Sequence, residues 1–197
     1  KPQRVVPATV EIVDIAGLVK GASKGEGLGN KFLANIRETD AIIHVLRCFD
    51  NDNIVHVDGS INPKRDKETI DIELQLKDLE TIEKKIEKTF RLAKTGNKEA
   101  QKEILVLEKV KNELERSNNV RSINFSMEDR KSYITPLQLI TEKPVLYVCN
   151  VSEADAVKGN SYISGVKELI ANEKAEILYL AVSTEADIHD LDSYEDR

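Results

Sequence analysis

The chain of 197 residues is long enough for one domain, or for one domain that carries an insertion. Its 29 lysine and arginine residues stand against 35 aspartate and glutamate residues, and the formal net charge of -6 argues against a protein that binds DNA through a generally basic surface. No apolar run approaches the roughly 18 residues that a membrane span needs, and the first residues show no signal-peptide pattern. Two cysteines are too few for a disulfide framework, so we expect a cytoplasmic protein with Cys48 and Cys149 as buried, reduced thiols.

The first motif is a short strand that ends in a phosphate-binding turn. The β-branched run at residues 10–15 predicts a buried strand, and Asp14 and Gly17 at its end form an Asp-x-x-Gly pattern. An aspartate in this place reaches Mg²⁺, usually through water, and the glycine lets a backbone N–H approach a terminal phosphate. Four glycines between residues 21 and 29 predict a loop that changes shape with its ligand.

A helical segment at residues 32–36 and a second apolar run at 41–49 follow this loop. The order of strand, turn, glycine-rich loop, helix and strand predicts the switch half of a P-loop nucleotidase.

Residues 64–118 predict an antiparallel helical hairpin. Apolar residues recur three and four positions apart on both sides of a turn at residues 95–97, within an otherwise charged sequence. Gly96 suits the left-handed position past a helix end, and Asn97 can cap the next helix. Basic residues predominate near the turn. This group is either an ordinary solvated helix face or a contact for a polyanion such as ribosomal RNA. The candidate polyanion contacts are Lys84, Lys85, Lys88, Arg91, Lys94 and Lys98.

Strands and helices alternate again after residue 130. Strands are predicted at residues 144–148 and 177–182, with an amphipathic helix at 161–172 between them. The alternation predicts an α/β fold, a mostly parallel, doubly wound sheet with its ligand at the carboxyl ends of the strands. We therefore divide the chain into an α/β domain formed by residues 1–63 and 133–197, and a helical coiled-coil insertion at 64–132.

The predicted base-binding site follows the strand at residues 144–148. An Asn-Val-Ser-Glu sequence begins at Asn150, where GTPases carry Asn-Lys-x-Asp. Glu153 is one methylene too long to satisfy the donors of guanine, and Val151 replaces the lysine that covers the base. A site that cannot pair those donors loses a discrimination that otherwise reaches ~10⁴-fold. We therefore predict ATP over GTP, with Asn150 oriented toward the base. The segment with Ala181 and Val182 resembles the last base-contacting loop of such nucleotidases.

The string DIAGLVKGASKGEGLGNKFLANIRETDAI, followed by RCFDNDNIVHV, resembles the Obg-like ATPases of the YchF subfamily, and the resemblance covers nearly all of the chain. It implies a TRAFAC-class P-loop NTPase with a G-domain-like sheet and a coiled-coil insertion. The implied ligands are ATP and Mg²⁺, with a monovalent cation as a further candidate. The implied partner is the ribosome, through its RNA or a ribosomal protein, and no membrane.

The family carries its P-loop upstream of the segment that matches Lys1 and a TGS domain downstream of the one that matches Arg197. No Gly-x-x-x-x-Gly-Lys-Ser/Thr sequence occurs in the chain. We therefore expect an internal fragment that by itself binds nucleotide poorly or folds incompletely, because the phosphates lack their main cradle and two strands lack a pairing partner.

Catalysis is expected to be slow. Leu18 stands where Ras-like GTPases place the glutamine that orients the attacking water, and leucine cannot hydrogen-bond to water. His56, in the matched NDNIVHV string, is the candidate for that polar role, and a purely structural role is its alternative. Two other functions stay open: a non-catalytic module whose hairpin binds RNA or protein, and a GTPase.

Overall fold

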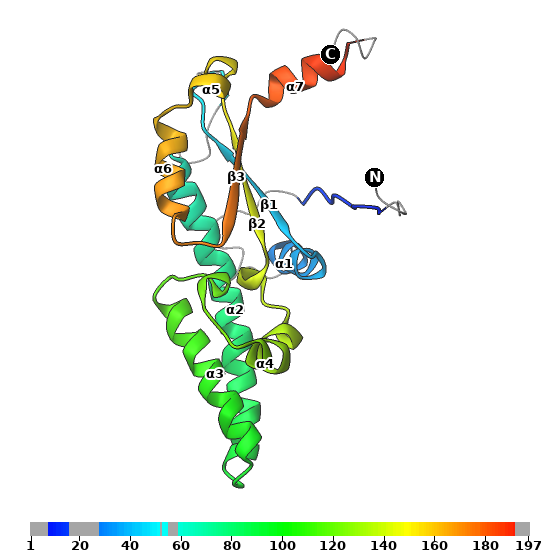
Figure 1. The fold of residues 1–197 in the computed structure, drawn as a ribbon, viewed down its shortest axis with the longest axis vertical. Helices are drawn as coiled ribbons and strands as arrows, with labels where there is room; N and C mark the ends of the chain where they lie inside the picture. Colours follow the sequence, from blue (N-terminus) through cyan, green and yellow to red (C-terminus); the bar gives the residue numbers. More distant parts are fainter. Residues whose placement is uncertain (1–7, 16–27, 52, 55–58, 192–197) are drawn as a thin grey trace, which may run out of the picture.

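The computed structural model describes residues 8–15, 28–51, 53–54 and 59–191 (Figure 1). The first part holds α1 (Leu28–Glu38) and β1 (Ile42–Arg47), and the hairpin is formed by α2 (Pro63–Ala93) and α3 (Lys98–Glu115). Short helical turns follow: η1 (Val120–Ser122), α4 (Met127–Asp129), η2 (Arg130–Ile134), η3 (Thr135–Leu137) and η4 (Ile140–Glu142). The last part holds β2 (Val145–Asn150), α5 (Glu153–Lys158), α6 (Ser161–Ile170), β3 (Ala175–Leu180) and α7 (Val182–His189).

The described strands form one parallel sheet in the order β1-β2-β3. Arg47 pairs with Asn150, which pairs with Leu180, so all three strands end at the same edge. The central strand β2 is a nearly continuous apolar run, as expected for a strand with parallel neighbours on both sides. The structure therefore confirms the predicted α/β fold with parallel strands.

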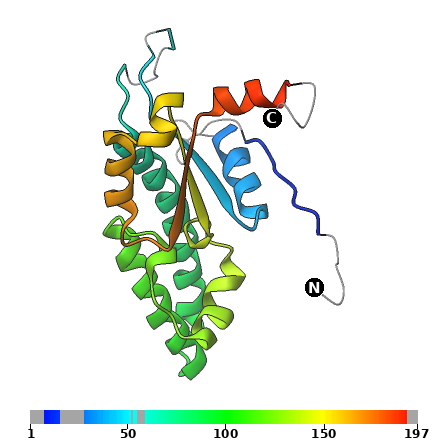
Figure 2. The same ribbon diagram turned by 45° about the horizontal axis from the view of Figure 1, so that its top comes forward.

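One face of the sheet is covered by α6 and the first part of α2, as Figure 2 shows, while α1 lies next to β1. Cys48 and Cys149 are buried, free thiols in this core, as predicted, and the Cys48 thiol is in hydrogen-bonding contact with Cys149. That contact and burial raise the pKa of Cys48. The buried residues of this core are Leu46, Cys48, Val145, Tyr147, Cys149, Val151, Ile163, Val166 and Ile170.

The prediction of a buried strand at residues 10–15 is wrong for this structure. These residues have no regular secondary structure, and Val10 and Ile12 are 82% and 78% exposed. A strand needs a neighbour for its backbone N–H and C=O groups, and β1 pairs only with β2 among the described strands. Ile15 alone packs partly against the small core formed by α1, α2 and η4.

The hairpin forms as predicted, with each helix capped by an asparagine. The Asn62 side chain accepts a hydrogen bond from Arg65 N, with Pro63 at the first helical position. Asn97 accepts one from Ala100 N at 3.0 Å, and Gly96 before it has a φ of 84°. The seam also packs against the segment after α3; its buried residues are Ile82, Leu107, Val110, Leu114, Val120, Ile123, Ile134 and Leu139.

A buried charge network joins the hairpin to the sheet. Lys67 on α2 is 2% exposed, and its Nζ lies 2.5 Å from both Asp71 Oδ2 and Glu173 Oε1. Glu173 also binds Arg121 Nη1 at 3.2 Å and accepts a hydrogen bond from Tyr147 Oη at 3.0 Å. Burial raises the pKa of Glu173, but Lys67 and Arg121 outweigh it, and the net shift is downward.

A second anchor joins the middle of α2 to the segment before β2. The Asp78 carboxylate is fully buried and accepts hydrogen bonds from Ile140 N, Thr141 N and Thr141 Oγ1 at 2.7–2.9 Å. Burial raises the pKa of Asp78, and these donors oppose the rise. The two anchors fix α2 against the sheet at several points along its length.

Candidate functional site

The predicted base-binding residues come together where β2 and β3 end. Val151 N donates a hydrogen bond to Leu180 O at 3.0 Å, which continues the pairing of the two strands. Val182 N donates to Asn150 Oδ1 at 3.2 Å, so the side chain at the end of β2 holds the start of α7. Val151 and Ala181 are 3% and 4% exposed and form the floor of this edge.

The Asn150 carboxamide is oriented by that contact. Only its oxygen can accept the Val182 N–H, so its NH₂ group keeps two donors, and it makes no hydrogen bond with the described part of the chain. Glu153 is the first residue of α5 and is exposed, and Ser152 caps this helix by accepting a hydrogen bond from Asp155 N. The edge therefore offers an amide donor and a carboxylate acceptor three residues apart.

Arg47 organises the loop that follows β1, a role that the sequence analysis missed. Its guanidinium donates to Phe49 O, Asn51 O and Ile54 O at 3.2, 3.1 and 2.9 Å and lies 4.9 Å from the centroid of the Phe49 ring. The backbone at Phe49, Asn51 and Ile54 is thus held against the end of β1. The only available signal was an arginine at a strand end before a polar turn, within the matched RCFDNDNIVHV string.

The residues predicted at the phosphate end are only partly described. Gly17, Leu18 and His56 lie outside the described residues. Asp14 is exposed and makes no hydrogen bond or ion pair with the described residues. Proteins hold Mg²⁺ by one or two carboxylates together with water and phosphate, so a free carboxylate such as Asp14 fits that role. Within the described ranges, no group of three or more His, Cys, Asp or Glu side chains gathers as a metal site.

The predicted polyanion contacts on the hairpin fall into two groups. Lys84 binds Glu80, and Lys85 binds Glu103 at 2.9 Å, so these two are neutralised within the hairpin. Lys88, Arg91, Lys94 and Lys98 form no ion pair with the rest of the described chain. The hairpin turn lies at the opposite end of the molecule from the strand ends that carry Asn150 (Figure 1).

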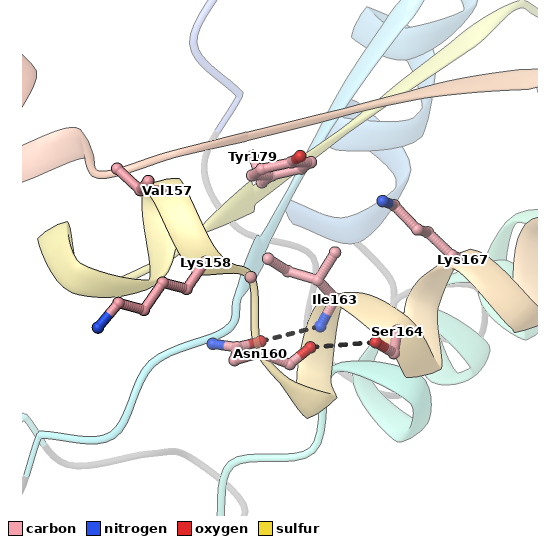
Figure 3. Close-up of a pocket in the computed structure, with 8 residues that line it drawn as sticks. Val157, Lys158, Asn160, Ile163, Ser164, Lys167 and Tyr179 are labelled. Atoms are coloured by element: carbon pink, nitrogen blue, oxygen red, sulfur yellow. Dashed lines mark hydrogen bonds between the residues drawn. The ribbon is translucent and has the colours of Figure 1, made fainter.

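A cavity of about 300 Å³ lies between α5, α6 and β3 (Figure 3). Lys158, Asn160, Lys167 and Tyr179 line it, but none of the predicted base-binding residues does. The Asn160 side chain is already used, because it accepts from Ile163 N and donates to Cys48 O and Asp155 Oδ2. Lys167 Nζ lies 5.1 Å from the centroid of the Tyr179 ring. Asn160 therefore holds the start of α6 against the end of β1, and Lys167 of α6 contacts β3.

No helix in the described ranges is both long enough and apolar enough to cross a bilayer. The helices α2 and α3 reach or exceed the necessary length, but both are highly charged.

Comparison with known proteins gives a consistent result. The pattern of the 50S ribosome-binding GTPase family matches residues 2–109. The ribosome-binding ATPase YchF of Escherichia coli O157:H7 is 50% identical over 195 residues, which are 99% of this chain and 53% of that protein. Its Bacillus subtilis counterpart is 46% identical over 196 residues, 98% of this chain and 53% of that protein.

The structure of the Schizosaccharomyces pombe YchF GTPase aligns with a TM-score of 0.80 and 36% identity, covering 99% of this chain and 54% of that one. The chain thus spans about half the length of the relatives it matches. The parallel sheet, the hairpin and the asparagine at the end of β2 all lie within the 99% of this chain that aligns with the Escherichia coli relative. The chain belongs to the 50S ribosome-binding GTPase family, and its homologues there are the YchF proteins.

Proposed function

We propose that the intact protein is a ribosome-associated, cytoplasmic switch that binds and slowly hydrolyses ATP in preference to GTP. Relatives named ribosome-binding ATPases support association with the ribosome and ATP as the nucleotide. The name of the yeast structure, by contrast, specifies a GTPase. The observation that carries the choice of ATP is the edge at the end of β2. There Val151 takes the place of the guanine-covering lysine, and Asn150 is fixed by Val182 N.

Base selection would follow from the donors and acceptors at this edge. The free NH₂ group of Asn150 donates to a ring nitrogen of adenine, and the Glu153 carboxylate accepts from its exocyclic amino group. Guanine presents an N1–H and an N2 amino group that need a shorter, bidentate carboxylate. A base whose donors stay unpaired is rejected, because burying them costs free energy that no contact returns.

At the phosphate end, Asp14 would hold Mg²⁺ through water, and Gly17 would place a backbone N–H near the terminal phosphate. Mg²⁺, when bound, supplies positive charge to the phosphates. Because Leu18 cannot orient water, His56 or a monovalent cation would take that part, and turnover stays slow. Residues 18–31 would change shape with the state of the nucleotide.

The test is a competition assay on the full-length protein with a fluorescent ATP analogue. We expect ATP to displace the analogue at a concentration at least about tenfold lower than GTP does. V151K/E153D restores the guanine-binding pattern and should raise the affinity for GTP by roughly tenfold or more. E176D, at an exposed glutamate of β3, is the matched control. Equal competition by GTP and ATP in the unmodified protein would instead favour a GTPase.

A second candidate function is a binding module that acts through the hairpin without nucleotide hydrolysis. It is favoured by the four basic residues near the hairpin turn that have no acidic partner in the described chain. N150A in the full-length protein distinguishes the two functions. If the protein is a switch, N150A abolishes nucleotide binding and makes ribosome co-sedimentation independent of nucleotide. If it is only a binding module, the unmodified protein already lacks nucleotide binding, and its co-sedimentation does not depend on nucleotide.

A further inference from the structure

We propose that the hairpin tip binds RNA with unpaired bases, through cations that take its phosphates and an exposed phenyl ring on which a base stacks. The tip is defined as Lys88, Phe90, Arg91, Leu92, Lys94 and Lys98, on the last turns of α2 and the start of α3. The inference rests on the proposed ribosome association only for the source of that RNA. Its contacts lie at the opposite end of the molecule from the nucleotide-binding edge (Figure 1).

The tip carries four cations that form no ion pair with the described chain, Lys88, Arg91, Lys94 and Lys98, against two carboxylates in the same turns, Glu87 and Glu99. Further from the turn, two lysines of α3 are paired with acids: Lys102 Nζ lies 3.1 Å from Asp129 Oδ1, and Lys111 Nζ lies 2.8 Å from Glu83 Oε1. Lys88 and Arg91, three residues apart on one helical face, are exposed and lack such partners in the described chain. Unpaired cations in a chain of net charge -6 favour a negatively charged partner at this place.

The tip also exposes apolar surface beside those cations. Phe90 and Leu92 are 49% and 58% exposed and do not belong to the buried seam of the hairpin. Lys94 Nζ lies over one face of the Phe90 ring, 4.6 Å from its centroid, so a base that stacks on this face displaces the ammonium toward the RNA phosphates. A flat ring flanked by phosphate-binding cations suits unpaired nucleobases, which stack on aromatic side chains. Duplex RNA keeps its bases stacked inside the helix, so they cannot stack on Phe90. An acidic peptide would account for the cations but not for the exposed ring.

The hairpin holds these groups in place before any partner arrives. Thr89, one residue before Phe90, is 3% exposed and donates a hydrogen bond to Glu103 Oε2 on α3 at 3.1 Å. Lys85 binds the same carboxylate group, so two residues of α2 are tied to α3 just below the tip. Because the two helices are already fixed to each other, the backbone that carries the tip need not be ordered on binding, and only its side chains lose conformational freedom.

The experiment measures fluorescence anisotropy of two labelled RNAs with the full-length protein: a stem-loop with an unpaired loop, and a fully paired duplex of equal length. F90A should weaken stem-loop binding roughly tenfold, the effect of losing one stacked base, and should leave duplex binding unchanged. L105A, at a 72% exposed leucine of α3, is the matched control and should change neither. K88E/R91E should weaken binding of both RNAs at least about tenfold and flatten the salt dependence.

K131E/K158E, two exposed lysines away from the tip, is the control for charge and should bind as the unmodified protein does. Equal binding of duplex and stem-loop, with F90A indistinguishable from L105A, would overturn base stacking and leave a contact to phosphates alone. Displacement of the stem-loop by polyglutamate at equal charge would overturn RNA in favour of an acidic protein. ATP competition on the same variants separates this inference from the proposed function, because it should be unchanged in every tip variant.

Discussion

His44 lies on β1, within the charged surroundings of the Lys67 network. Its ring centroid is 5.5 Å from that of Tyr147. Burial, aided by Lys67 and Arg121 and opposed by Asp71 and Glu173, lowers its pKa from 6.5 to about 4. The folded protein therefore keeps this imidazole neutral at pH values where an unfolded chain takes up a proton.

We expect His44 to make the protein less stable in mild acid. Because the pKa is lower in the folded state, the stabilisation is complete above about pH 6.5 and is lost as the pH falls toward about 4. At about pH 5 the free energy of unfolding should have fallen by about 2 kcal/mol from this source. Urea unfolding near pH 7 and pH 5 measures it. H44Q should lack that part of the loss, whereas H189Q, at an exposed histidine of α7, should keep it. An equal loss in H44Q would contradict this assignment.

At the scale of the elements, α2 is held against the sheet by buried ions. A buried pair contributes little net stability, but removing one partner leaves the other charge uncompensated. Lys67 binds two carboxylates, and Arg121 is the second cation of the set, so the four charges balance. The attachment of the hairpin therefore depends on each member of the network.

A double-mutant cycle tests this dependence. K67M alone leaves two carboxylates with one cation and should cost about 3 kcal/mol of unfolding free energy. K67M/E173Q restores balance with Arg121 and Asp71, so it should cost clearly less than the sum of its single changes, with a coupling above about 1 kcal/mol. Lys64 and Glu168, whose side chains are 48% and 76% exposed at 3.4 Å, are the control pair and should show nearly none. Additive costs at the buried pair would refute the network.

How far the sequence predicts these elements depends on whether the cause is local. Gly96 and Asn97 predicted the hairpin turn because a left-handed residue and a helix cap need only their neighbours. The strand ends predicted the meeting of Asn150 and Val182 through the topology of parallel sheets. Contacts between side chains that are far apart in the sequence cannot be predicted in this way.

Lys67 and Glu173 are 106 positions apart, and no sequence pattern around either residue predicts their contact. Arg47 was missed because its partners are backbone carbonyls whose direction no periodicity predicts. The run at residues 10–15 has the composition of a strand, yet composition cannot supply the neighbouring strand on which pairing depends.

At the scale of the whole molecule, α2 links the two proposed sites. It is a single helix of 31 residues, about 46 Å long at 1.5 Å per residue. It begins at Pro63, shortly after the loop that Arg47 holds, and ends in the tip (Figure 1). Nucleotide and RNA would therefore bind at opposite ends of one rigid element, and neither ligand would obstruct the other.

The two faces of the sheet are covered unequally. Ile43 and Val45 on β1 and Leu178 on β3 are 52%, 59% and 46% exposed, on the face opposite α2 and α6. Val45 and Leu178 pair with the same residue of β2, so these side chains lie on neighbouring strands and form one patch. Parallel sheets are normally covered on both faces, and contiguous apolar patches promote association.

We therefore expect the purified 197-residue chain to bind an apolar dye and to self-associate through this face. I43K/V45K replaces two of the three exposed side chains and should lower dye fluorescence on the order of twofold, because the patch loses most of its apolar surface. Sedimentation velocity should show a matching shift toward monomer. L105K/V157K adds the same charge at isolated exposed positions, 72% and 89% exposed, and should change neither measurement. If both variants reduced association equally, added charge would be the cause, and the open sheet face would not.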